Sequence, residues 1–274
     1  LGKEVFEILF EPYLHLPIKT LDIPVAGHGY GPHVLPFLFD LVNLVNDVPS
    51  KGKALADEDK DGSKTIKCLS NTRAVLRRIS SAHPSSLGLH PALYFYSQGG
   101  VFQPAALLSF IALIKAWDTP DFIRFTDVRM NFEQFLLTHR GVTDAIRELG
   151  SGSRSRPRIV ALYARLIERF AAGESVEKVA GSIASEPGFG FIASEPEDDP
   201  TYVEATGEKF NRSVKGGAFL RQALPSAVKC AKCGGLIHRN GIQVGHKHAR
   251  RDGGSGQLSN AQLEHPLCNS TVQQ

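Results

Sequence analysis

The sequence predicts a mainly α-helical protein in which a helical body, residues 1–185, is joined by a linker, 186–207, to a small metal-binding module, 208–274. Two observations lead to this prediction. Segments with apolar residues at helical spacing fill the first part of the chain. Three of the four cysteines fall within the last 45 residues. A chain of 274 residues is long enough for two such units.

Apolar residues at helical spacing define the expected elements of the body. The predicted helices are Val34–Val45, Thr65–Ile79, Gln103–Trp117, Asp121–His139, Val142–Leu149 and Pro157–Ala172. The apolar and aromatic segment Leu87–Tyr96 is expected to begin a buried layer. The glycines and serines of 150–155 are expected to separate the last two helices.

The composition is that of an ordinary soluble globular protein, with 42% apolar and 22% charged residues. No signal peptide is visible, and the apolar run at Pro104–Ile114 is too short to span a bilayer. We therefore expect a cytoplasmic protein with no membrane partner. The chain begins at Leu1, so we also expect that it was cut from a longer protein with a further N-terminal domain.

Charge divides the chain near residue 207. Residues 186–203 are acidic and proline-containing, and the sequence IASEP occurs at both 183–187 and 192–196. From Glu208 to Arg251 there are ten lysines and arginines against one acid, Glu208. This reversal predicts the domain boundary. The basic block indicates a polyanionic partner, nucleic acid first, and its alternative interpretation is a solvated basic surface.

Two ligand pairs predict a metal site in the module. Cys230 and Cys233 form a Cys-x-x-Cys knuckle, and His265 and Cys268 repeat the same spacing after 31 intervening residues. Two such pairs give the tetrahedral coordination that suits zinc, and four protein ligands make that zinc structural. A redox Cys-x-x-Cys would normally begin a helix, whereas Gly234 follows here. Because about 45 residues bury little apolar surface, the module is expected to need its metal.

The segments between the ligand pairs predict two strands and a helix. Gly241–His246 alternates as a strand does, and Asn240 and Gly241 form a hairpin-turn signal. Ala261–Glu264 is the expected returning strand. The residues after Pro266 are expected to form a short helix with Cys268 and Asn269 in its first turn. The predicted order is strand, long loop, strand, helix.

The stretch VGHKHARRDGGS followed by NAQLEHPLCN resembles the motif of HNH endonucleases, in the form that carries a zinc knuckle. The resemblance covers about residues 226–274 and implies a ββα-metal fold. It implies that His246 is the general base, that Asn260 is the central asparagine and that Asn269 closes the motif. It also assigns His265 and Cys268 to the second zinc pair.

The same resemblance implies hydrolysis of DNA with Mg²⁺ or Mn²⁺ as the catalytic ion. Such an ion binds phosphate oxygens, while a neutral histidine such as His246 takes a proton from water. Asn269 offers its carbonyl oxygen to the ion, and Asn260 is expected to pin the loop and orient His246. Three basic side chains are expected to hold flanking phosphates: Lys247, Arg250 and Arg251.

The sequence departs from the family pattern at two positions. Gly245 stands where an Asp or His metal ligand is usual, and Ala249 stands where proline is common. Either His248, two residues after His246 and on the same side of an extended segment, replaces the missing ligand, or the site is weak or inactive.

The body bears a fainter resemblance, through LGLHPALYFYS and the helices after it, to the region between a ParB-like domain and a C-terminal HNH domain in bacterial defence proteins. That resemblance implies restriction of foreign or modified DNA. Two alternatives belong to other functional classes. One is a non-catalytic zinc module that binds nucleic acid, and the other is a helical scaffold with a protein partner.

Overall fold

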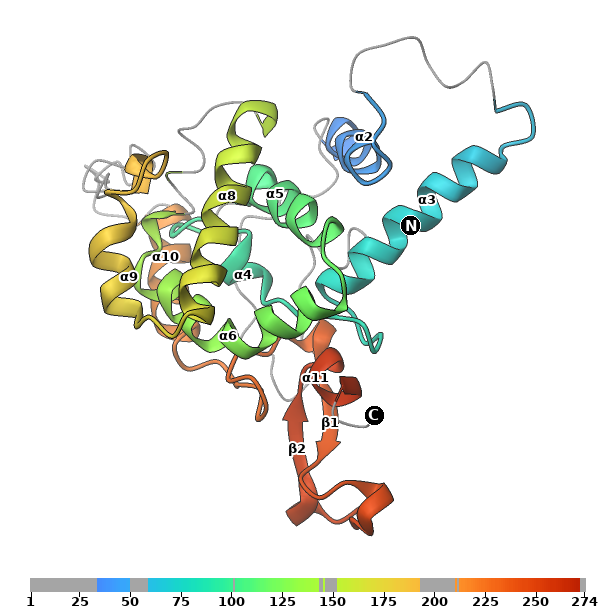
Figure 1. Ribbon diagram of the computed structural model, residues 1–274, viewed down its shortest axis with the longest axis vertical. Helices are drawn as coiled ribbons and strands as arrows, with labels where there is room; N and C mark the ends of the chain where they lie inside the picture. Colours follow the sequence, from blue (N-terminus) through green and yellow to red (C-terminus); the bar gives the residue numbers. More distant parts are fainter. Residues whose placement is uncertain are drawn as a thin grey trace.

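The structure is a computed structural model, and it describes residues 34–49, 59–100, 102–142, 145, 152–192, 210 and 212–271. The predictions for residues 1–33, for most of Val142–Leu149 and for 193–207 lie outside this part of the chain. Within it the protein is mainly helical, with a small two-stranded sheet near the C-terminus (Figure 1). The predicted fold class is therefore confirmed.

The helices follow the predicted order. Those of the body are α2 (Val34–Val45), α3 (Ser63–Ile79), α4 (Pro91–Tyr94), α5 (Pro104–Lys115), α6 (Thr119–Thr138), α8 (Gly152–Ala171) and α9 (Val176–Ile183). The bounds of α2, α3, α5 and α6 agree with the predictions within about two residues, and α8 differs at its start. Helices α4 and α9 were not among the predicted helices. None of the helices in the described ranges is long and apolar enough to cross a membrane.

Helix α8 begins five residues before the position that the sequence predicts. Gly152–Ser155 were expected to lie between helices, but they form the first turn of α8. Pro157 is the sixth residue of this helix and cannot donate a backbone hydrogen bond to the turn before it. Ser155 is completely buried in this turn, so packing against the body overrides the weak helix preference of glycine and serine.

The core of the body forms where α5, α6 and α8 meet (Figure 1). Aromatic rings fill it, and Phe110 of α5 packs against Phe125 of α6 and Tyr163 of α8 with ring centroids about 6 Å apart. Tyr94 of α4 stacks on Phe132 of α6. Since Leu87, Leu89 and 91–96 are all buried, the predicted buried layer at Leu87–Tyr96 is confirmed.

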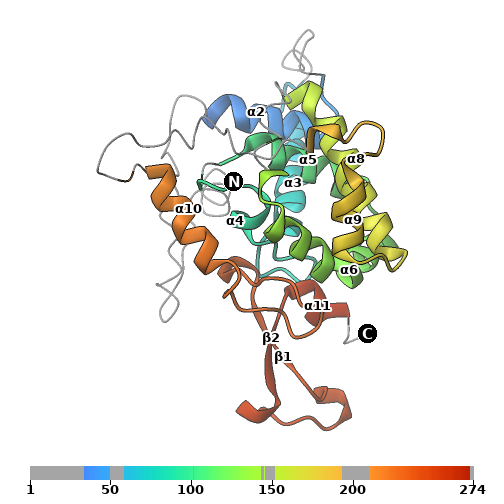
Figure 2. The same ribbon diagram turned by 90° about the vertical axis from the view of Figure 1, so that its left-hand side faces the viewer.

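The C-terminal module consists of α10 (Arg212–Ala223), the cysteine knuckle, β1 (Gln243–His246), β2 (Ala261–Glu264) and α11 (Pro266–Thr271). The two strands pair antiparallel, and their hairpin extends away from the body in both views (Figures 1 and 2). The predicted strand–loop–strand–helix order is confirmed. The first strand is shorter than expected, because Gly241 belongs to a 3₁₀ turn, Arg239–Gly241.

The loop between α3 and α4 holds the module against the body. Leu267 N donates to Ser86 O at 3.0 Å, and Ser270 Oγ donates to Pro84 O at 2.9 Å. From the hairpin, Gln243 Nε2 donates to Ala82 O at 2.8 Å. Leu236 of the knuckle is buried in the same core as the body helices. The division at 186–207 stays a prediction, and its described start packs on α8 through the Glu186–Arg165 ion pair at 2.7 Å.

Backbone contact between two glycines brings the module close to this loop. A Cβ on Gly241 would overlap the Cα of Gly88, and a Cβ on Gly88 would lie 2.8 Å from Cδ2 of His265. Gly88 also has a positive φ of 59°, which favours glycine. Gly241 therefore serves close packing rather than the hairpin turn that the Asn-Gly pair suggested.

Candidate metal centre and the adjoining hairpin

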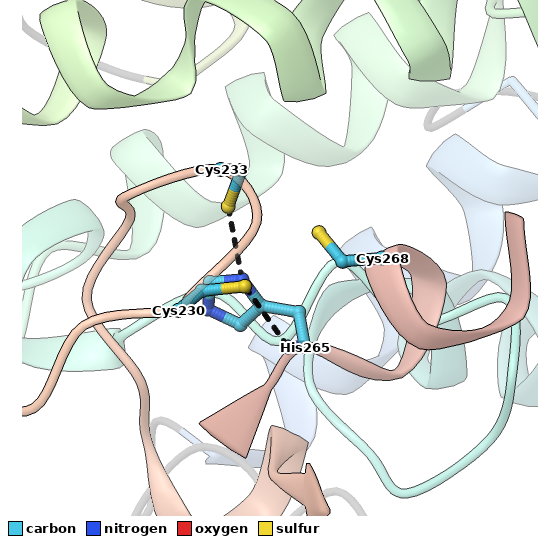
Figure 3. A group of neighbouring side chains, drawn as sticks. All are labelled: Cys230, Cys233, His265 and Cys268. Carbon is cyan, nitrogen blue, oxygen red and sulfur yellow. Dashed lines mark hydrogen bonds between the residues drawn. The ribbon is translucent and has the colours of Figure 1, made fainter. Parts of the chain in front are cut away.

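Four side chains converge where the knuckle meets the start of α11. The sulfurs of Cys230, Cys233 and Cys268 and one ring nitrogen of His265 all lie within 4.8 Å of one another (Figure 3). His265 Nδ1 lies 3.3 Å from Cys233 Sγ, and the His265 backbone N–H donates to Cys230 Sγ at 3.4 Å. The predicted four residues thus form a cluster that can hold a metal ion such as zinc.

Hydrogen bonding orients the His265 ring for metal binding. Its Nε2–H donates to Leu236 O at 3.0 Å, which leaves the Nδ1 lone pair directed at the sulfurs. Burial and then the nearby charge of Arg129 lower the pKa of His265. The imidazole is therefore neutral near pH 7, which is the form that binds a metal, and its second nitrogen is anchored by a carbonyl in the manner usual for metal-bound histidines.

The three thiols share their charge unequally. Hydrogen bonds from Cys233 and Cys268 hold the pKa of Cys230 well below its ordinary value. The same interaction with Cys230 raises the pKa of Cys233 to about 11 and also raises the pKa of Cys268. One thiolate is thus stabilised by two neutral thiols. A bound cation would replace the shared protons, and this is the chemistry expected of a thiolate metal site.

A buried ion pair on α6 supports the cluster from the body side. Arg129 and Glu133 are 1% and 2% exposed, and Arg129 Nε donates to Glu133 Oε1 at 2.6 Å. The guanidinium also lies 3.2 Å from His265 Nδ1 through Nη1. Burial, the largest single cause, lowers the pKa of Arg129, but the charges of Glu133, Tyr94 and Cys233 together with the hydrogen bond to Glu133 outweigh it, so the pKa lies above its ordinary value. Arg129 is therefore a permanent positive charge beside the three sulfurs.

The remaining atoms of this pair bind the backbone on both sides of the cluster. The Arg129 guanidinium donates to Leu87 O and, at 3.2 Å, to Gly88 O. Glu133 accepts from Tyr94 Oη at 2.8 Å and from the Leu236 backbone N–H. Both the guanidinium and the carboxylate therefore have hydrogen-bond partners inside the protein, as a buried ion pair requires.

Sequence reasoning missed Arg129 and Glu133. Their only sequence signal is a pair of opposite charges four residues apart on a helix, which is common on exposed faces. The module side carries a second signal, because Gly235 leaves the space that the Arg129 side chain fills: a Cβ there would lie 2.8 Å from Arg129 Cδ.

The hairpin beside the cluster has two distinct faces. Gln243 pairs with Glu264 and Gly245 with Gln262, so these four residues share one face. We call it the α11 face, because Asn269 Nδ2 of α11 donates to Gln243 Oε1 at 2.8 Å. His246 pairs with Ala261 at the end of β1, and strand alternation directs it to the opposite face.

Asn260 holds the loop between the strands. Its Oδ1 accepts from His248 N at 2.8 Å, and its Nδ2 donates to His248 O at 3.1 Å and to Ser255 O at 2.7 Å. The Asn260 side chain thus closes the loop directly after His246. This geometry agrees with the loop-pinning role expected from the sequence. His248 itself is exposed in this loop.

The predicted phosphate-binding residues lie at the outer end of the hairpin. Lys247, Arg250 and Arg251 are exposed there, and Lys247 Nζ donates to Ser259 O at 2.9 Å. Asp252 is a weak counterpart to Arg251, at 3.8 Å. The loop therefore presents a basic tip to solvent, with no buried charge.

The α11 face carries a carboxylate that sequence reasoning missed. Glu264 is 1% exposed, and Gln262 Nε2 donates to its Oε1 at 2.6 Å. A Cβ on Gly245 would overlap this carboxylate, so Glu264 occupies the space that a side chain at 245 would take. The sequence does hold a signal, because Asp252 and Glu264 are the only acids after Glu208. The cross-strand register that joins Glu264 to Gly245 was needed to recognise it.

Comparison with known proteins found no matching family model, no matching curated protein and no matching solved structure.

Proposed function

We propose that the protein is a metal-dependent endonuclease of the HNH type that hydrolyses phosphodiester bonds in DNA. The observation that carries the proposal is the ββα unit clamped by the Cys₃His cluster. This unit has His246 at the end of β1, Asn260 closing the following loop and Asn269 in α11. The unit combines a potential general base, a loop clamp and a basic tip within about 30 residues.

The chemistry follows from the residue types. A phosphodiester resists hydrolysis because its charge repels the nucleophile and because the alkoxide leaves poorly. His246 is half-buried, and its ring makes no hydrogen bond to any described residue, so it is available to take a proton from water. Asn260 fixes the backbone of the loop that follows His246. A bound Mg²⁺ or Mn²⁺ would supply the positive charge that offsets the charge of the phosphate.

The exposed basic tip supports DNA as the polyanion. Arg250 and Arg251 can bind phosphate oxygens with two hydrogen bonds each, whereas the Lys247 ammonium contributes a point charge. Such contacts release counterions, so binding should weaken steeply as salt increases. The wider role that we attach to this activity, restriction of foreign or modified DNA in the cytoplasm, follows from the resemblance alone.

A plasmid-cleavage assay tests the proposal. Zinc-loaded protein is incubated with supercoiled DNA and Mg²⁺ or Mn²⁺, and nicked and linear products are quantified. His246→Ala is expected to lower the cleavage rate by roughly 100-fold or more, since general-base catalysis contributes about that much. His83→Ala is the control, because His83 is an exposed histidine that lies outside the hairpin. Equal rates for wild type and His246→Ala would refute the proposal.

A second candidate function is non-catalytic binding of nucleic acid by a zinc-containing module. Strand alternation favours it, because His246 and the α11 face lie on opposite sides of the hairpin. Fluorescence anisotropy with labelled duplex DNA separates the two functions. Salt-dependent binding that is reduced in Arg250→Ala and Arg251→Ala, together with no cleavage under any metal condition, would establish the non-catalytic function.

A further inference from the structure

We propose that the Glu264 carboxylate is a ligand of a divalent-cation site on the α11 face of the hairpin. This site is separate from the sulfur cluster, and the ion would be a hard cation such as Mn²⁺ or Mg²⁺. Any part of Glu264 in DNA cleavage rests on the proposed nuclease function, whereas binding of the ion does not.

Glu264 is a buried acid without a basic partner in the described part of the chain. Its side chain is almost completely buried, and no lysine, arginine or histidine of the described residues forms an ion pair with it. Its hydrogen bond comes from the neutral amide of Gln262. A buried carboxylate costs several kcal/mol unless a cation compensates it. Glu133, buried to the same extent, does have a compensating arginine.

The side chains around the Glu264 carboxylate suit a hard cation. Three side-chain amides, those of Gln243, Gln262 and Asn269, share the α11 face with Glu264. Carboxylate and amide oxygens are the ligands that Mg²⁺ and Mn²⁺ prefer, usually with water completing the coordination. The adjoining Cys₃His cluster has soft ligands instead. The two neighbouring sites therefore select different metals.

The space beside Gly245 is filled by the Glu264 carboxylate. Because residue 245 has no side chain, the Glu264 carboxylate lies directly against the β1 backbone. A carboxylate from β2 thus occupies the position from which a side chain of β1 would act. His248 is a poorer candidate ligand, since it lies in the exposed loop and offers a nitrogen to a cation that prefers oxygen.

Manganese binding tests the site directly. Zinc-loaded chain is titrated with Mn²⁺, and free Mn²⁺ is measured by electron paramagnetic resonance, so the readout does not depend on DNA cleavage. We expect one Mn²⁺ per chain and an affinity that falls by about tenfold or more in Glu264→Gln. Asp252→Asn removes the other acid of the module, which is exposed at the tip, and is expected to leave the affinity unchanged.

A second pair of variants, in which the carboxylate is moved from β2 to β1, tests the site even if Glu264→Gln fails to fold. In Glu264→Ala the space at 245 becomes free, so the double variant Gly245→Asp/Glu264→Ala supplies the carboxylate from β1 instead. We expect Glu264→Ala to lose Mn²⁺ and the double variant to recover it. Zinc content and circular dichroism of each variant report on folding.

The outcomes separate this inference from the nuclease proposal. If wild type binds no Mn²⁺, or if Glu264→Gln binds it as tightly as wild type, the inference is wrong whatever the cleavage assay shows. If Mn²⁺ binding depends on Glu264 but DNA is not cleaved, the cation site stands and the nuclease function fails. If DNA is cleaved and Glu264→Gln cleaves and binds Mn²⁺ normally, the nuclease function stands and the cation site fails.

Discussion

Replacement of Arg129 by methionine would leave the Glu133 carboxylate buried without its cation. Removal of one partner from a buried pair costs about 3–5 kcal/mol, because the remaining charge is desolvated and uncompensated. The carbonyls of Leu87 and Gly88 would also lose their donor, which adds to the loss. We therefore expect Arg129→Met to lower the free energy of unfolding by at least about 3 kcal/mol.

The same change should weaken the metal centre. The positive charge of Arg129 favours the thiolate form of Cys233, and residues that support metal ligands typically change affinity by about 10–100-fold. Urea unfolding of the zinc-loaded chain measures the stability, and competition with a chromophoric chelator measures the zinc affinity. The double variant Arg129→Met/Glu133→Gln removes both charges and should recover part of the stability, because no buried charge is left unpaired.

Arg165→Met provides the comparison on the surface of the body. Arg165 pairs with Glu186 at 2.7 Å, but its side chain is 38% exposed, so solvent screens the pair and the loss of stability should be much smaller than in Arg129→Met. If Arg129→Met cost no more than Arg165→Met and zinc affinity were unchanged, the buried pair would not support the metal centre, and our reasoning would be refuted.

Two further predictions concern the contact between body and module. His90 packs edge-on against His238 of the module, with ring centroids 5.2 Å apart. Burial lowers the pKa of His90 to about 4 from an ordinary 6.5, so its stabilising contribution is complete above pH 6.5 and is lost as the pH falls toward 4. Between pH 7 and pH 5, wild type should lose about 2 kcal/mol more than His90→Phe in urea unfolding, and equal losses would contradict this. Gly241→Ala should destabilise by about 3 kcal/mol or more, because its Cβ would overlap the Gly88 backbone. Gly256→Ala, with open space around it, should change stability by less than about 0.5 kcal/mol, and similar losses in a thermal unfolding series would rule out the close contact.

The elements that the sequence predicted well are those determined by short-range patterns. Val34–Val45 and Ala261–Glu264 have the predicted bounds, since helical spacing and strand alternation act over a few residues. The four metal ligands could be predicted for the same reason. Each pair, such as Cys230 with Cys233, spans a single turn, so spacing alone brings its two ligands together.

The interactions that could not be predicted join residues far apart in the chain. Arg129 and His265 are 136 positions apart, and no local pattern links them. The position of the Glu264 side chain against Gly245 follows only from the register of the two strands. A shift of the strand register by one residue would turn Glu264 to the other face of the hairpin. The residue type alone was therefore not sufficient to predict where its side chain lies.

The buried pair on α6 also explains why the module and the body depend on one another. Desolvation of Arg129 and Glu133 is offset only when their partners are in place, and these partners come from both parts: Leu87 and Gly88 from the body and Leu236 from the module. If the module separated from α6, the pair would lose its partners in the module. If the knuckle unfolded without its metal, Leu236 and His265 would no longer meet α6 in this geometry. Metal binding and docking therefore stabilise the same set of contacts, which links them thermodynamically.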